Sequence, residues 1–166
     1  MLNELWDIHK DDWGGSPYGE YRFEVDGVNY YAGMMDDEDF DLRSIYKEFE
    51  VILRKRGHYE MFYNRHYISI FKFTFGFHEG THINWSLERD TGTKKGNAIK
   101  VLSSVISIFK DAVKLQKTPK LIHFSGKGKR IKVYNKLVKY MAKAIRYEYM
   151  IFKGRKFGSV YILYKI

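Results

Sequence analysis

Hydrophobic residues recur along the chain at two spacings, about 2 and about 3.6 residues, which predict strands and amphipathic helices of an α/β protein. Alternating apolar and polar positions predict strands at Tyr21–Val25 and Val28–Met34. Asp26-Gly27 between them is a strong signal for a two-residue hairpin turn. We therefore expect an antiparallel strand pair early in the chain.

Two helices and a long strand are predicted next to this hairpin. Leu2–Trp13 has the spacing of a short helix that the following glycines and proline end. Leu42–Arg56 places its apolar residues on one face, with acidic residues before it and Gly57 after it, as the helix dipole and C-cap favour. His66–Phe77 has apolar residues on both faces, so we expect a central strand with helices on both sides.

Residues 81–134 predict a strand–helix–strand–helix unit around which the fold is organised. Thr81–Arg89 alternates as a strand, and Asp90–Asn97 is a turn rich in Gly, Thr and Lys. Ala98–Gln116 is a long amphipathic helix, Lys120–Ser125 is a short buried strand, and a second helix begins near Lys129. A right-handed crossover of this kind would place the two strands parallel in one sheet.

Two last strands, Tyr147–Phe152 and Val160–Ile166, complete the expected architecture: one domain over residues 1–166, with a mixed sheet of about six or seven strands flanked by helices. The composition, 45% hydrophobic and 17% aromatic, excludes a disordered chain. The absence of cysteine excludes disulfides and thiolate chemistry. No apolar run reaches the length of a membrane span and no signal peptide is recognisable, so we expect a cytoplasmic protein.

Charge divides the chain into two unlike halves. Residues 1–90 hold 10 Lys/Arg and 18 Asp/Glu, a net charge of −8, whereas residues 91–166 hold 19 Lys/Arg and two acids, a net charge of +17. This asymmetry predicts an anionic partner for the C-terminal half. Nucleic acid, a phosphorylated cofactor and an acidic protein all satisfy it, and solvated lysines on helix faces account for part of it.

The turn before the long helix is a candidate phosphate site. Gly96 and Ala98 are small enough to let a phosphate approach the backbone, and the N–H groups that open a helix carry partial positive charge. Lys94 and Lys95 add countercharge. A plain loop punctuated by glycine has the same composition, so the turn alone leaves both interpretations open.

The order of these elements resembles the Gcn5-related N-acetyltransferase (GNAT) superfamily. Its members carry a pyrophosphate loop, Arg/Gln-x-x-Gly-x-Gly/Ala, before the long helix; the corresponding run here is Thr93-Lys94-Lys95-Gly96-Asn97-Ala98. They also carry a tyrosine in the helix after the next strand, and Tyr134 within Arg130–Leu137 occupies that place. Gly96-Asn97-Ala98, Val101–Val105, Phe124-Ser125 and Arg130–Tyr134 more specifically resemble small GNAT-like proteins encoded by bacteriophages.

This resemblance covers about residues 66–166 and implies a mixed, mostly antiparallel sheet with a central parallel strand pair. It also implies acetyl-CoA as cofactor, with its pyrophosphate held by residues Thr93, Lys94, Lys95, Gly96, Asn97 and Ala98. The pantetheine arm would enter a cleft between residues 81–89 and 120–125. The protein would be an N-acetyltransferase or a catalytically reduced relative, in the host cytoplasm if a phage encodes it.

In that case Tyr134 would protonate the departing thiolate, because the leaving sulfur needs a proton and a positioned phenol supplies one. Glu88 and His123 are the nearest candidates for the general base toward the acceptor amine. Tyr134 also lies on the apolar stripe of its helix, so a purely structural place in the core is the alternative.

Residues His78-Glu79-Gly80-Thr81-His82 match the His-Glu-x-x-His signature of zinc proteases. The signature requires a helix, on which positions i and i+4 share one face. Here it lies between two strand patterns, so we expect a polar hairpin turn and no metal site.

Basic residues follow one face of the second helix. The cluster comprises Lys129, Arg130, Lys132, Lys136, Lys139 and Lys143. With aromatic residues nearby, it indicates an alternative function: a non-enzymatic protein whose basic face binds nucleic acid or an acidic protein. No standard nucleic-acid-binding motif is present, so sequence-specific recognition is not expected.

Overall fold

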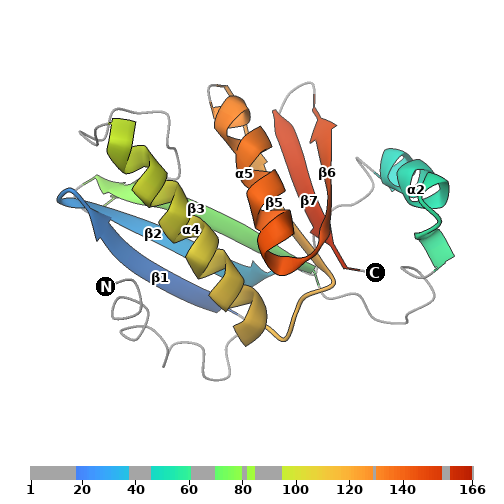
Figure 1. The fold of residues 1–166 in the computed structure, drawn as a ribbon, viewed down its shortest axis with the longest axis horizontal. Coiled ribbons are helices and arrows are strands. Elements are labelled where there is room, and N and C mark those ends of the chain that lie inside the picture. The colour runs from blue at the N-terminus through green and yellow to red at the C-terminus, as the bar shows by residue number, and fades with distance from the viewer. Residues whose placement is uncertain are drawn as a thin grey trace.

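The computed structural model describes residues 18–37, 46–60, 70–79, 82–84, 95–128, 130–154 and 158–165. Within these residues the chain forms an α/β fold in which three helices flank a mixed sheet (Figure 1). The elements are β1 (Tyr18–Val25), β2 (Val28–Asp36), α2 (Tyr46–Lys55), β3 (Ile70–Glu79), β4 (His82–Asn84), α4 (Lys95–Leu115), β5 (Leu121–Gly126), α5 (Arg130–Ile145), β6 (Glu148–Lys153) and β7 (Ser159–Tyr164).

Most predicted elements are confirmed, with ends shifted by a few residues. The long helix begins at Lys95, three residues earlier than predicted, and α5 begins at Arg130 with Tyr134 in its first turns. The predicted helix at Leu2–Trp13 lies outside the described residues, as does most of the turn at 90–97. Among the described helices, none combines the length and the apolar composition needed to cross a membrane.

The sheet has the strand order β1-β2-β3-β5-β7-β6, and β4 pairs with the end of β3 beside this path. Every pairing is antiparallel except that of β3 with β5. The expected mixed, mostly antiparallel sheet with one central parallel pair is therefore present.

The sequence predicted the wrong strand as the parallel partner of β5. Residues 82–84 form β4, which turns back antiparallel on β3, and it is β3 that runs parallel to β5. The reason lies in the connections: two residues separate β3 from β4, and so short a link permits only antiparallel pairing. The longer connection from β3 to β5 contains α4 and provides the crossover that a parallel pair needs.

The hairpin of β1 and β2 forms as its turn residues predict. Val25 pairs with Val28 across the turn, and Asp26 and Gly27 have φ angles of 52° and 78°. Two consecutive positive φ angles are those of a type I′ turn, whose twist matches that of the strands.

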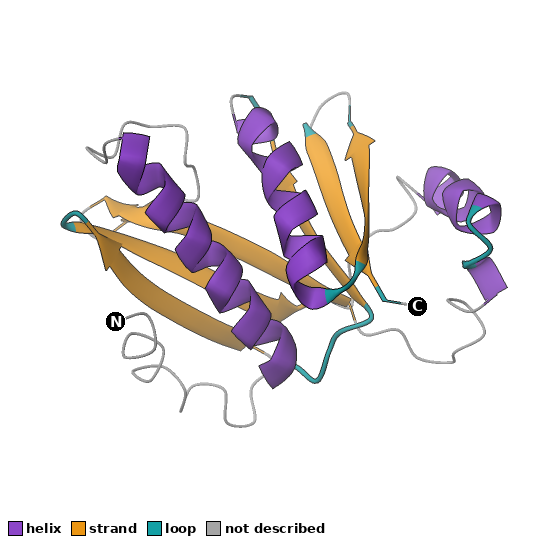
Figure 2. Ribbon diagram, viewed as in Figure 1, coloured by secondary structure: helices purple, strands orange, loops and turns teal. Residues whose placement is uncertain are grey.

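Helices cover the two faces of the sheet separately. On one face α4 lies over β1 and β2, and α5 lies over β5, β7 and β6 (Figure 2). Phenylalanines 71, 73 and 75 of β3 belong to the core on this face, whereas Ile70 belongs to a second core with α2. The alternation predicted for this strand is thus confirmed.

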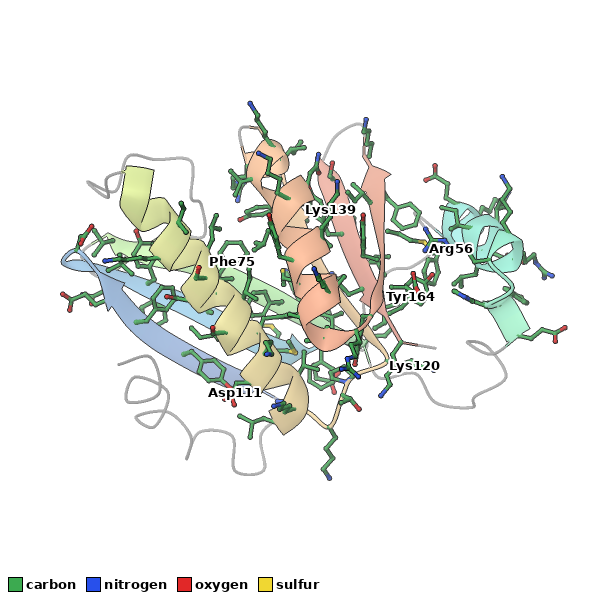
Figure 3. All side chains as sticks on the ribbon, in the orientation of Figure 1. Arg56, Phe75, Asp111, Lys120, Lys139 and Tyr164 are labelled. Atoms are coloured by element: carbon green, nitrogen blue, oxygen red, sulfur yellow. The ribbon has the colours of Figure 1, made fainter. Side chains whose placement is uncertain are left out.

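Helix α2 is anchored to the second face through Phe49 and Leu53, which pack with Tyr164 and neighbouring strand residues. Gly57, with a φ angle of 71°, ends the helix: its N–H donates to the Arg54 carbonyl, and the His58 N–H donates to the Leu53 carbonyl. Just beyond the helix, Arg56 Nη1 donates to the Tyr164 hydroxyl over 3.0 Å, and Figure 3 shows the two side chains together.

We predict that Leu53→Ala lowers the free energy of unfolding by about 2–5 kcal/mol, because it opens a cavity at a fully buried position. Val51→Ala, at a half-exposed position on the same helix, should change it by no more than about 0.5 kcal/mol. Urea denaturation of the two variants measures the difference. Equal losses would show that α2 does not depend on this contact with the sheet.

Candidate functional site

In the described residues, β3 and β5 pair over three residues of each strand before they separate. Residues Ile70–Lys72 of β3 pair with Leu121–His123 of β5. β5 pairs with β7 along its whole length on its other edge, and the end of β3, from Phe77 onward, pairs with β4. Figure 1 shows β3 and β5 diverging from their short paired stretch. In the described part of the chain, residues 73–76 of β3 therefore face a notch in the sheet.

A cavity of about 350 Å³ occupies this notch, a volume typical of small-molecule sites. Its walls come from β2, β3, β5 and α5: Met35, Lys72, Phe73, Thr74, Phe75, Phe124, Ser125, Arg130 and Tyr134. Phe75 and Phe124 belong to the core under the helices, whereas Thr74 and Ser125 alternate with them along their strands. The cavity thus reaches both faces of the sheet.

Tyr134 forms the wall on the helix side. Its ring is buried, with its centroid 5.1 Å from that of Phe75, 5.7 Å from Phe124 and 6.0 Å from Tyr161. A Cβ at Gly126 would lie 2.5 Å from the tyrosine ring, so only glycine at the end of β5 lets the ring lie there. Tyr134 is a core residue, as the structural alternative predicted, and it also lines the cavity; its role as an acid stays a prediction.

The start of α5 is fixed to the sheet by Tyr161 of β7. Its hydroxyl donates to Asn135 Oδ1 over 2.7 Å and lies 3.3 Å from the Ile131 carbonyl oxygen. Its ring stacks on Phe124 at 4.9 Å between centroids. Because Ile131 and Asn135 lie within one helical turn of Tyr134, these contacts fix the position of Tyr134 on the sheet.

His123 lies on the opposite face of β5, directly beside Lys72 in the strand register. Its side chain is 5% exposed, and its Nε2 lies 2.7 Å from Asp37 Oδ2. The Asp37 backbone is held in turn, because its N–H donates to the Ile70 carbonyl over 2.9 Å. The structure thus pairs His123 with a carboxylate at the end of β2.

Burial lowers the pKa of His123 to about 4, and the charge of Lys72 acts in the same direction, while Asp37 opposes both. The imidazole is therefore neutral at neutral pH. A neutral ring that donates from Nε2 to Asp37 has its lone pair on Nδ1 and is able to accept a proton.

Tyr134 lines the cavity on the helix face of the sheet, and the His123–Asp37 pair lies on the other face of β5, where His123 is the strand neighbour of the wall residue Lys72. Such an arrangement suits transfer of an acyl group, since one side of the reacting carbonyl receives a nucleophile and the other releases a leaving group. Sequence reasoning missed Asp37, Lys72 and the notch itself. The available signal was the pair of polar residues Lys72 and Thr74, which interrupt one face of an otherwise apolar strand.

The other predicted site residues are placed as follows. Glu88, Thr93, Lys94 and Lys129 lie outside the described residues. The backbone of residues 95–98 forms the first turn of α4, as the phosphate-site interpretation requires. Arg130 lines the cavity, whereas Lys132, Lys136, Lys139 and Lys143 are exposed along α5.

The His-Glu-x-x-His run spans the end of β3 and the start of β4, where Glu79 pairs with His82, and it is therefore part of a hairpin and not of a helix, as expected. In the described part of the chain, no group of three or more His, Cys, Asp and Glu residues is arranged to hold a metal ion.

The low pKa of His123 predicts that stability declines as the pH falls from about 6.5 toward about 4. In this window the unfolded chain binds a proton at this histidine and the folded chain does not, so protonation favours unfolding. His123→Gln should remove that part of the decline, and urea denaturation at steps across the window measures it. His58→Gln, at a half-buried histidine beside Tyr164, is the control. An equal slope in the parent and His123→Gln would contradict the prediction.

Comparison with known proteins adds no relative: no family model, curated protein or solved structure matches the chain.

Proposed function

We propose that the protein is a GNAT-like acyl-CoA-binding protein that transfers an acetyl group from acetyl-CoA to an amine. The observation that carries the proposal is the cavity at the notch between β3 and β5, which Tyr134 lines, with the His123–Asp37 pair on the other face of β5 next to the wall residue Lys72. The succession of β3, α4, β5 and α5 supports it, because it is the order of elements on which the resemblance to the GNAT superfamily depends.

The edge of β3 is suited to a pantetheine arm. At residues 73–76 it borders the cavity instead of a neighbouring described strand, and an uncovered strand edge offers N–H and C=O groups to an extended amide-containing ligand. The phenylalanine rings of the wall suit the aliphatic parts of such an arm. Acetyl-CoA would supply the activated acyl group as a thioester.

The first turn of α4 would receive the pyrophosphate. Its N–H groups lack partners within the helix and carry partial positive charge, and Gly96 imposes no side chain there. Arg130, at the wall of the cavity, adds a cation that favours an anionic ligand.

In this proposal Tyr134 and His123 divide the proton transfers. His123 accepts a proton from the amine as its nitrogen bonds to the acyl carbon, and Asp37 stabilises the resulting imidazolium. Tyr134 donates its phenolic proton to the sulfur as the carbon–sulfur bond breaks. Because the two residues lie on opposite faces of the sheet, His123 would act on the amine from one face and Tyr134 on the thiolate sulfur from the other.

Isothermal titration of the full chain with acetyl-CoA tests the binding step. We expect Gly96→Glu to weaken binding at least about tenfold, because it adds bulk and negative charge at the start of α4. Leu115→Glu adds the same charge at an exposed position in the last turn of α4 and should leave binding unchanged. An absence of binding to the parent, or equal affinities in all three proteins, would contradict the proposal.

For turnover we predict that Tyr134→Phe lowers kcat about 10²-fold or more while acetyl-CoA binding stays nearly intact, because it removes the acid and keeps the packed ring. Tyr140→Phe, at an exposed tyrosine on the same helix, is the matched control. Release of free thiol from acetyl-CoA with a panel of primary amines measures the rate. Equal rates for the two variants would leave Tyr134 a structural role only, and binding without turnover in the parent would identify a catalytically reduced protein.

A further inference from the structure

A second hollow lies between α4 and α5 and shares no lining residue with the cavity at the notch. It is a groove of about 570 Å³, lined mainly by apolar side chains of the two helices: Ile99, Leu102, Ser103, Ile106, Lys132, Val133, Lys136, Leu137 and Tyr140. Leu102, Ile106 and Leu137 join the core beneath and form its floor.

The rim of this groove gathers three exposed, large hydrophobic side chains. Ile99, Val133 and Tyr140 are 69%, 37% and 62% exposed. In the described residues only two other large hydrophobic side chains, Val51 and Leu115, are comparably exposed, and neither lines the groove. Exposed apolar residues gathered in one place mark a binding surface more often than scattered ones do.

The apolar positions follow helical spacing on both walls. On α4, Leu102 and Ile106 follow Ile99 by three and seven residues. On α5, Leu137 and Tyr140 follow Val133 by four and seven residues. Each helix thus presents one continuous stripe to the groove. Two facing stripes of this kind form a receptor for the apolar face of a third helix.

Charge around the groove has one sign. Lys132 and Lys136 line it, and Lys139 and Lys143 continue the row along α5. Asp111 is the only acidic residue in α4 and α5; it accepts a hydrogen bond from the Tyr21 hydroxyl over 3.4 Å, and Figure 3 places it toward the end of α4 away from the first turn. An occupant of this groove needs an apolar face flanked by negative charge.

We propose that the groove binds an acidic amphipathic helix of another protein. The apolar face of that helix occupies the space between Ile99 and Tyr140, and its acidic flank pairs with Lys132 and Lys136. Nucleic acid fits less well, because the walls are mostly aliphatic and Tyr140 is their one aromatic ring. This interaction is separate from acyl transfer and does not depend on it.

The test uses the full chain and a fluorescent synthetic 18-residue helix with Leu on one face and Glu elsewhere. A peptide of the same composition in scrambled order, without an apolar face, is the first control. Fluorescence anisotropy should show the amphipathic peptide binding at least about tenfold tighter, with affinity that falls as salt rises.

Variants then locate the site. Tyr140→Glu should weaken binding of the amphipathic peptide at least about tenfold, whereas Val51→Glu on α2, at the opposite face of the sheet, should not. Lys132→Gln with Lys136→Gln should reduce the salt dependence, and Lys47→Gln with Lys55→Gln, two exposed lysines of α2, should preserve it.

Several results would overturn the proposal. One is failure of the parent protein to bind the amphipathic peptide. A second is equal binding of the scrambled peptide by the parent, or of the amphipathic peptide by Tyr140→Glu. Another is displacement by duplex DNA whose own binding also requires Tyr140, which would assign the groove to nucleic acid. A dimer in sedimentation velocity that Tyr140→Glu dissociates would assign it to a second copy. Peptide binding only after removal of residues 1–17 would assign it to the chain's own N-terminal segment.

Discussion

The short parallel pairing of β3 with β5 is the constraint on which the rest of the structure depends. In the described residues, three residue pairs join two half-sheets, each covered by its own helix; beyond them the edge of β3 pairs with β4, while β5 stays paired with β7 on its other edge. A sheet joined so briefly has to open, and the opening lies where Phe75, Phe124 and Tyr134 meet. The aromatic rings span the notch on the helix side and keep it open as a cavity, where a fully paired sheet would have closed it.

The same constraint brings the two unlike halves of the chain together. Strands β1 to β3 come from the acidic half, and α4, α5 and strands β5 to β7 come from the basic half, so the notch lies on their border. The acidic half supplies Asp37 and the basic half supplies His123. Burying such a pair costs solvation free energy, and a histidine with a lowered pKa whose strand neighbour Lys72 lines a cavity is a candidate for chemistry on physical grounds. The exposed groove between α4 and α5 lies entirely within the basic half.

The sequence by itself determined the turns and helices that depend on neighbouring residues. Asp26-Gly27 specified a hairpin because two consecutive positive φ angles suit these residues and few others. The apolar stripes of α4 and α5 specified amphipathic helices, and stripe residues such as Val105, Leu137 and Met141 are buried. Turn signals and hydrophobic periodicity depend only on residues that are close in the sequence. Both can therefore be recognised without knowledge of the fold.

Only the tertiary structure decided which strand runs parallel to β5, because pairing depends on the length and path of the connections, and residues 81–89 alternate as well as residues 70–79 do. The partner of His123 is 86 residues away in the sequence, so nothing local pointed to Asp37. Tyr134 was found from its motif, but whether it faced core or cavity was settled by the notch beside it. The sequence by itself therefore determined the elements and named Tyr134 and His123 as candidates, whereas the long-range pairing of strands decided where these residues lie.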